Sequence, residues 1–310
     1  MYSFVVPIMK IINKRKVIEE HLVGDLKTTE TIYEYLPGKL DTIPSRKGVK
    51  KAFSRKQLLL NGEIASSLDR VKNTDLITVL EYRGAVTKEY NSELTVHFED
   101  EHVAIVEKPP GLATSGNQWK TLQNALPANI QPSLKKDALS VPLTVHRLDA
   151  KTHGLVIVAK TASARIELGR MFESRKVHKT YTAVLQGKLT EEGIFNKMIE
   201  GKEAITDYKV LSHFKHVKDD WNTLVELSPV TGRKHQLRIH CAQSGHPIVG
   251  DVKYSDKENV LRGKGIFLSA NKLRFPHPFK DDLIEITIPL PAKFKRYIDR
   301  MARWVDRTNT

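Results

Sequence analysis

Short runs of Val, Ile, Leu and Thr recur from about residue 94 onwards, and they limit the fold more than any other feature of the chain. The clearest are HVAIVEK (102–108), GLVIVAK (154–160), TYTAVLQG (180–187), NTLVELS (222–228) and LIEITI (283–288). Runs of this length and composition predict β-strands. Because strands often follow strands directly, the order predicts an α+β fold with a mixed or antiparallel central sheet flanked by helices and loops.

Two segments of the same region have the spacing of amphipathic helices. ARIELGRMFESRK (164–176) repeats apolar residues every three or four positions, and AKFKRYIDRMARW (292–304) follows Pro291 with basic residues on its polar face. The stretch 127–142 holds three prolines and predicts a surface loop or lid.

The first part of the chain predicts a separate, smaller unit. We expect a small α/β module within residues 1–88, with its core at about 30–82, and a large domain over 94–310. TIYEYL (31–36) and GVKKAFSRKQLLLNG (48–62) have helical spacing, and LITVLEY (76–82) predicts a strand after the Asn61-Gly62 turn. The polar stretch 84–93 is the expected linker.

The charge of the chain favours a polyanionic partner. Its 310 residues carry a formal net charge of +14. A protein this basic favours nucleic acid, since neutralising phosphates releases condensed counterions.

The cysteine content and the N-terminal segment indicate the compartment in which the protein works. Cys241 is the single cysteine, so no intramolecular disulfide forms, which is typical of a reducing compartment. Cys241 itself is expected to be a small buried hydrophobe. The apolar residues at the N-terminus precede the basic ones, the reverse of a secretory signal, and no apolar stretch reaches membrane-spanning length. We expect a cytoplasmic protein with no membrane partner.

Asp149 stands out within HRLDAKTHG (146–154). It lies between LTV (143–145) and the strand from Gly154, at a place where an aspartate commonly caps a turn. A catalytic role would need a nearby cation to keep a desolvated carboxylate ionised. Three residues could supply that cation: Arg147, Arg233 and Arg238.

TGRKHQLRIH (231–240) alternates its side chains. As a strand, it would place Arg233, His235, Leu237 and Ile239 on one face and Lys234, Gln236, Arg238 and His240 on the other. The Thr231-Gly232 turn directly before Arg233 indicates a start at about His235. His235 and His240 are five apart, which separates them on a strand or a helix, and no third ligand lies nearby. We therefore expect no metal. The chain also carries none of the GxGxxG, GxxxxGK[ST] or GxSxG signatures.

Four segments together resemble the RluA-type pseudouridine synthases. The resemblance covers about residues 94–291, in that family's order and spacing. The segments are EKPPG (107–111), HRLDAKTHG (146–154), HKTYTAVLQG (178–187), and TGRKHQLRIH (231–240) with GHPIVGDVKY (245–254).

The N-terminal unit is similar to the small RNA-binding fold first named from a small-subunit ribosomal protein. The likeness rests on Ser45-Arg46, the helix with Val49, Lys50 and Lys51, LLLNGEIA (58–65) and VKNTDLITV (71–79). It departs from the pattern at Asn73-Thr74, where glycine before Asp75 is usual. The resemblance implies RNA binding through Arg46, Lys50 and Lys51.

The resemblance to the synthases implies isomerisation of uridine to pseudouridine in structured RNA, with no cofactor or metal. It implies that Asp149 is the catalytic carboxylate acting on a flipped base. Arg233 is the first choice for its cationic partner and Arg238 the second. Tyr181 is implied to stack on the target base, and Arg147 to fill the place that the base leaves. The implied substrate-binding set also includes His146, Lys108, Leu237 and Arg238.

His153 departs from the family pattern HRLDxxTSG, where serine is usual. It is expected to alter loop geometry, and a histidine there could also contact a phosphate. Pro110 in EKPPG is a milder departure.

Two other functions compete with catalysis on uridine. One is an RNA-binding or ribosome-assembly factor that has lost catalysis, although Asp149, Tyr181 and Arg233 are all present. The other is a glycosidase, which would need paired carboxylates such as Asp149 and Asp251, although Asp251 is expected to be structural. We expect ribosomal RNA ahead of transfer RNA as the target, and a monomer.

Overall fold

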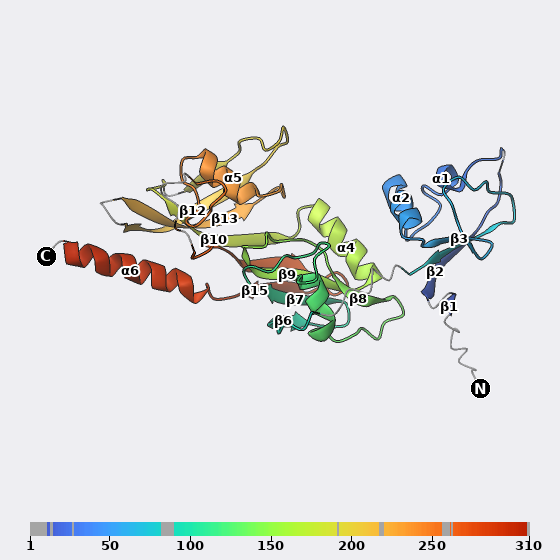
Figure 1. Ribbon diagram of the computed structural model, residues 1–310, viewed down its shortest axis with the longest axis horizontal. Coiled ribbons are helices and arrows are strands. Elements are labelled where there is room, and N and C mark those ends of the chain that lie inside the picture. The colour runs from blue at the N-terminus through green and yellow to red at the C-terminus, as the bar shows by residue number, and fades with distance from the viewer. Residues whose placement is uncertain are drawn as a thin grey trace. The chain divides into compact units, whose positions relative to one another are not determined.

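The computed structural model describes residues 11–12, 15–26, 28–81, 90–190, 192–216, 220–255, 261 and 263–308. The chain divides into two compact units, residues 1–86 and residues 87–310 (Figure 1). Most of the expected linker, residues 84–89, lies outside the described residues.

The first unit is a five-stranded sheet with two helices. The sheet order is β1-β2-β5-β3-β4. The elements are β1 (Ile11–Ile12), β2 (Arg15–Leu22), α1 (Ile32–Tyr35), α2 (Arg46–Ser54), β3 (Leu58–Leu60), β4 (Glu63–Ile64) and β5 (Leu76–Leu80). The helical spacing predicted over 48–62 is wrong at its end, because LLL pairs with β5 as β3. Leu58 and Leu59 are buried in the sheet, which removes their apolar side chains from water.

Helix α2 turns its basic residues to the solvent. Ser45 caps it by accepting a hydrogen bond from the Gly48 amide (3.0 Å). Val49 and Ala52 are buried against the core, whereas Arg46, Lys50 and Lys51 are exposed. The same helix therefore holds the unit together on one side and presents positive charge on the other.

The second unit is built on a ten-stranded mixed sheet, as the sequence predicted. Its order is β11-β12-β13-β10-β14-β9-β7-β6, with β15 on β14 and β8 on β9. The strands are β6 (Val96–Glu99), β7 (Val103–Lys108), β8 (Ala138–Thr144), β9 (His153–Thr161), β10 (His178–Gln186), β11 (Glu192–Phe195), β12 (Thr206–Lys215), β13 (Trp221–Pro229), β14 (Leu268–Pro276) and β15 (Leu283–Thr287). The five predicted strands are all present. Strand β14, which the sequence did not predict, lies between β9 and β10.

Helices cover the sheet as the spacing indicated. Helix α4 (Ala162–Glu173) packs Ala164, Leu168 and Met171 against β9, and α6 (Ala292–Thr308) buries Phe294, Tyr297 and Met301. Shorter elements are α3 (Leu122–Ala125), the 3-10 helix η1 (Leu126–Ala128) and α5 (Gln236–Gln243). Among the described residues, no helix combines the length and apolar character needed to cross a bilayer.

The region predicted as a loop over 127–142 is partly regular. It begins within η1, and β8 starts at Ala138 and pairs with β9 through Leu143 and Ala159. Pro142 sits within β8 and is buried. The prediction of a loop is therefore wrong for residues 138–142. The register of β8 is irregular between Ala138 and Leu143, so an edge strand accommodates the proline.

Gly154 permits the close approach of two strands beneath the candidate site. Strand β9 runs parallel to β14, with Ser269 opposite His153 and Ala270 opposite Gly154. A Cβ atom on Gly154 would lie 2.3 Å from the Ala270 carbonyl oxygen, and its φ of +135° disfavours other residues. The glycine of HRLDAKTHG is thus a packing requirement.

We predict that Gly154→Ala destabilises the second unit by about 2–4 kcal/mol, since the methyl group meets the β14 backbone and φ is strained. Gly169→Ala is the matched control, because that helical position has nothing within 4 Å and the change should be neutral or stabilising. All three tryptophans lie in this unit, so urea unfolding followed by tryptophan fluorescence measures its stability. Equal stability of the two variants would contradict the packing argument.

Candidate active site

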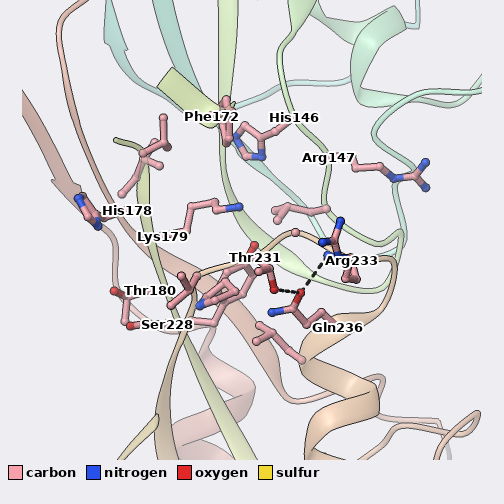
Figure 2. A pocket seen from close by; sticks show the side chains of 18 of the residues that line it. His146, Arg147, Phe172, His178, Lys179, Thr180, Ser228, Thr231, Arg233 and Gln236 are labelled. Carbon is pink, nitrogen blue, oxygen red and sulfur yellow. Dashed lines mark hydrogen bonds between the residues drawn. The ribbon is translucent and has the colours of Figure 1, made fainter. Parts of the chain in front are cut away.

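A cavity of about 1210 Å³ opens between the loop that follows β8, strand β10, the start of α5 and β14 (Figure 2). The sequence-predicted residues that line it are His146, Arg147, Asp149, Tyr181, Arg233, Leu237 and Arg238. Segments more than a hundred residues apart in the chain therefore meet at one site. Arg46, Lys50 and Lys51 belong to the other unit.

The loop that carries Asp149 is fixed from below by the EKPPG segment. The Lys108 ammonium donates to three carbonyl oxygens, those of Pro109 (2.9 Å), Leu112 (2.8 Å) and Ala150 (3.1 Å). The Gly111 amide also donates to Ala150 (2.7 Å). Lys108 is fully buried, and burial lowers its pKa to about 8, although the charge of Asp149 acts to raise it. The expectation that Lys108 contacts RNA is wrong, since its side chain holds the loop from inside.

His146 fastens the other end of this loop to β9. Its Nε2 atom accepts a hydrogen bond from the Ile157 amide (3.0 Å), and its ring packs on Phe172 with centroids 5.2 Å apart (Figure 2). Burial, followed by the positive charge of Lys179, lowers the pKa of His146 to about 3. The imidazole is therefore neutral at pH 7, and it anchors the loop while also lining the cavity.

Asp149 pairs with Arg238, which in turn binds a second carboxylate. Arg238 Nη1 donates to Asp149 Oδ2 (3.2 Å), while Nε and Nη2 donate to the two oxygens of Asp251 (2.7 and 2.8 Å). Burial opposes the charged form of Arg238, but Asp251 and Asp149 raise its pKa above the ordinary value. Asp251 is buried, whereas the Asp149 side chain keeps 22% of its surface exposed to the cavity. Asp149 is the one of the two that a substrate can reach.

The first choice of Arg233 as the partner of Asp149 is wrong. Arg233 is exposed, and its Nε donates to the Glu203 carbonyl oxygen (2.8 Å). It lies before α5 rather than in it, so its side chain leaves toward β12 while Arg238, on the helix, points to the loop. Arg233 therefore stands at the edge of the cavity.

The TGRKHQLRIH segment forms a turn and a helix, so the strand interpretation is wrong. Gln236 begins α5 and is fully hydrogen-bonded: its Oε1 accepts from Thr231 Oγ1 (2.7 Å) and the Arg233 amide (2.9 Å) (Figure 2). Its Nε2 donates to the Ile205 carbonyl oxygen (2.9 Å). The five residues QLRIH are too few to distinguish the two-residue period of a strand from the 3.6-residue period of a helix. The hydrogen bonds of the buried Gln236 side-chain amide favour the helix. Cys241, on α5, is buried as expected, and burial raises the pKa of its thiol.

Tyr181 and Leu237 form the apolar wall beside Asp149. Both are buried and belong to the core on this face of the sheet, with only 8% and 6% of their surfaces exposed. Burial and the negative charge of Asp149 raise the pKa of Tyr181, so its hydroxyl stays protonated at neutral pH. An aromatic face next to a carboxylate suits a planar base.

The rim of the cavity carries an excess of cations over its exposed carboxylates, Glu173, Asp207 and Glu285. Arg147, Arg175, Arg233, Lys234 and Arg274 are exposed along it. Lys179 reaches into the cavity from β10, and its ammonium lies 5.4 Å from the Phe172 ring centroid (Figure 2). Sequence reasoning missed Lys179 and Phe172, because nothing in a strand or helix pattern shows that their side chains line one cavity. Such a rim concentrates a polyanion over the site.

His153 does not reach the cavity. It is buried at the start of β9, where Nδ1 contacts Ser269 Oγ (2.8 Å) and Nε2 contacts Glu107 Oε1 (2.7 Å). Burial lowers the pKa of His153, although Glu107 acts to raise it. A phosphate contact is therefore wrong for this residue. It joins β7, β9 and β14 instead, which agrees with an effect on loop geometry.

Two observations concern the acidic and metal-binding residue types. Within the ranges that the structure describes, no group of three or more His, Cys, Asp or Glu could hold a metal ion. Arg238 occupies both oxygens of Asp251, so Asp251 is not the free second carboxylate that a two-carboxylate glycosidase would need. A carboxylate held by a buried arginine, an aromatic wall and a rim rich in arginine and lysine fit an enzyme that acts on a base of a nucleic acid.

Comparison with known proteins gives the family. The model of the RNA pseudouridylate synthase family matches residues 102–243, which include Asp149, Tyr181 and α5. The chain is 32% identical over 297 residues to YhcT, an uncharacterized RNA pseudouridine synthase of Bacillus subtilis, across 89% of this chain and 95% of the relative. It is 36% identical over 224 residues to ribosomal large subunit pseudouridine synthase D of Nitrosomonas europaea, across 64% of this chain and 62% of that protein.

A solved structure agrees. Human RNA Pseudouridylate Synthase Domain Containing 4 superposes with a TM-score of 0.53 and 25% identity, across 67% of this chain and 92% of that one. The chain belongs to the RluA family of RNA pseudouridine synthases, and it isomerises uridine to pseudouridine in RNA.

We predict that His146 makes the second unit less stable in acid. The unfolded chain protonates this histidine below about pH 6.5, whereas the folded chain does so only at about pH 3, so stability falls as the pH drops through that window. Between pH 7 and pH 5 the loss should be about 1–2 kcal/mol. His146→Gln keeps an acceptor for the Ile157 amide without the titration, and should lose less stability over the same interval.

The matched control is His178→Gln, which removes an exposed histidine from the same cavity. Urea unfolding at both pH values, followed by tryptophan fluorescence, gives the comparison. If His146→Gln and His178→Gln show the same pH dependence as the wild type, burial of His146 does not contribute to it.

Proposed function

We propose that Asp149 is the catalytic carboxylate of the isomerisation, and that Arg238 is its cationic partner. The reaction breaks the bond between N1 of uracil and C1′ of the ribose, turns the base, and joins C5 to C1′; C5 loses a proton and N1 gains one. Whether a carboxylate attacks the ring or acts at the sugar, it must be ionised and fixed in place. The observation that carries this proposal is the Arg238 Nη1 contact to Asp149 Oδ2 at the floor of the cavity.

Tyr181 and Leu237 are proposed to receive the flipped base. A base taken out of a helix needs an apolar or aromatic surface in place of its lost stacking. Tyr181 offers its ring beside Asp149, and its protonated hydroxyl is able to donate a hydrogen bond. Arg147 is exposed on the same loop as Asp149, so its planar guanidinium is proposed to take the place that the base leaves in the stack.

We propose ribosomal RNA as the substrate, ahead of transfer RNA, with the N-terminal module as a second RNA-binding surface. One relative is named for the large ribosomal subunit. The exposed face of α2 presents Arg46, Lys50 and Lys51, and the formal net charge of +14 supports an extended contact with phosphates.

We predict that Asp149→Asn abolishes pseudouridine formation, with a rate loss of about 10³-fold or more, because the amide is not ionised. RNA affinity should change little. The matched control is Asp207→Asn, which removes an exposed carboxylate from the same cavity. A pseudouridine map of total RNA from cells lacking the protein, complemented with each variant, identifies the site. Restoration of that site by Asp149→Asn would contradict the assignment.

We predict that neutralising α2 weakens RNA binding without slowing the chemical step. Changing Arg46, Lys50 and Lys51 together to glutamine should lower the slope of log affinity against log salt by about two to three, if each contacts one phosphate. The control changes three exposed lysines of the other unit, Lys120, Lys188 and Lys295, to glutamine. Filter binding across a salt series measures this slope for the two triple variants. Equal slopes for the two triple variants would remove α2 from the RNA-binding surface.

A further inference from the structure

His235 lies beside Asp149 in a backbone conformation that few residues adopt. It precedes α5 with φ of 56° and ψ of 23°, in the left-handed region. The conformation turns its ring toward the cavity, where Nε2 lies 3.7 Å from Asp149 Oδ1. Asp149 therefore has Arg238 on Oδ2 and His235 facing Oδ1.

Tyr254 determines which nitrogen of His235 carries the proton. The Tyr254 hydroxyl lies 2.8 Å from His235 Nδ1. If Nδ1 carried the proton of the neutral ring, the lone pair of Nε2 would face the carboxylate and repel it. When the tyrosine hydroxyl donates to Nδ1, Nε2–H points at Asp149 instead. The second arrangement satisfies both contacts.

We propose that His235 is a positioning residue for the isomerisation: its Nε2–H, oriented by Tyr254, holds Oδ1 of Asp149 as Arg238 holds Oδ2. The proposal rests on the proposed role of Asp149. A distance of 3.7 Å is longer than a hydrogen bond, but such contacts commonly shorten in the complex with substrate. Without His235, the carboxylate would be held at one oxygen only and could turn about its Cβ–Cγ bond.

The charge of His235 should affect the rate in acid. Burial lowers the pKa of His235, Asp149 acts to raise it, and the cations Arg238, Lys253 and Lys234 act to lower it; Tyr254 is the other titratable group against the ring. The net direction is downward, so the ring is neutral at pH 7. When the pH falls, the imidazolium forms an ion pair with Asp149, and that pair makes the carboxylate a weaker nucleophile or base.

Two substitutions separate this role from a merely structural one. His235→Asn tolerates the left-handed backbone, but its amide reaches only as far as Nδ1 does. His235→Gln places a donor where Nε2–H lies, although its backbone fits less well. A structural role favours the asparagine variant, whereas a contact to Asp149 favours the glutamine variant.

The experiment is a single-turnover assay with excess protein and total RNA from cells lacking it, labelled with tritium at C5 of uridine. Release of tritium reports the loss of the C5 proton. We expect His235→Asn to lower the maximal rate about 10-fold or more, with half-saturation unchanged within about twofold. His235→Gln should lose no more than about threefold at pH 7. In acid, where the His235 imidazole becomes protonated, the wild type should slow more than His235→Gln.

Tyr254→Phe tests the tautomer argument independently. It removes the hydroxyl that donates to Nδ1, so the maximal rate should fall by a factor similar to that of His235→Asn, again at unchanged half-saturation. Urea unfolding confirms that each variant is folded. The proposal is overturned if His235→Asn is as fast as the wild type, or if His235→Gln is no faster than His235→Asn. Activity of Asp149→Asn in the same assay would instead overturn the proposed role of Asp149, so the two failures are distinguishable.

Discussion

The buried guanidinium of Arg238 is the interaction on which the rest of the site depends. It satisfies both oxygens of Asp251 and still donates to Asp149, so one side chain joins α5, the segment after it and the loop after β8. A charge taken out of water is tolerated only with such partners, and removal of one partner would leave the others uncompensated. The arrangement leaves Asp149 as the carboxylate with access to the cavity.

Polar side chains hold the loop that carries Asp149 at both ends. The Lys108 ammonium donates hydrogen bonds to three carbonyl oxygens in and near this loop, and His146 accepts a hydrogen bond from the Ile157 amide of β9. Both residues belong to motifs that suggested contact with substrate; Lys108 is fully buried, whereas His146 also lines the cavity. A reactive group gains from such fixing, since little reorganisation remains when the substrate arrives.

The sequence predicted the sheet well where strands are rich in β-branched residues, as in GLVIVAK, and the amphipathic helices α4 and α6 from their spacing. It missed β14, the central strand LSANKLRFP, whose Asn271, Lys272 and Arg274 interrupt the apolar pattern. Lys272 pairs with Glu226 across the sheet, and Asn271 accepts a hydrogen bond from Thr182. Partners that are distant in the chain therefore allow polar residues in a central strand, and a local pattern does not show them.

The sequence by itself determined that the chain is a basic α+β protein with the ordered motifs of an RNA-modifying enzyme, because composition, strand runs and motif spacing are local properties. It also singled out Asp149 and Tyr181. Only the tertiary structure decided that Arg238 and not Arg233 faces Asp149, that Lys108 and His153 are internal, and that His235 adjoins the carboxylate with Tyr254 on its other nitrogen. The physical reason is that the first residue of α5 decides which arginine points toward Asp149. The hydrogen bonds of the buried Gln236 side chain to Thr231 and to the distant Ile205 fix that first residue.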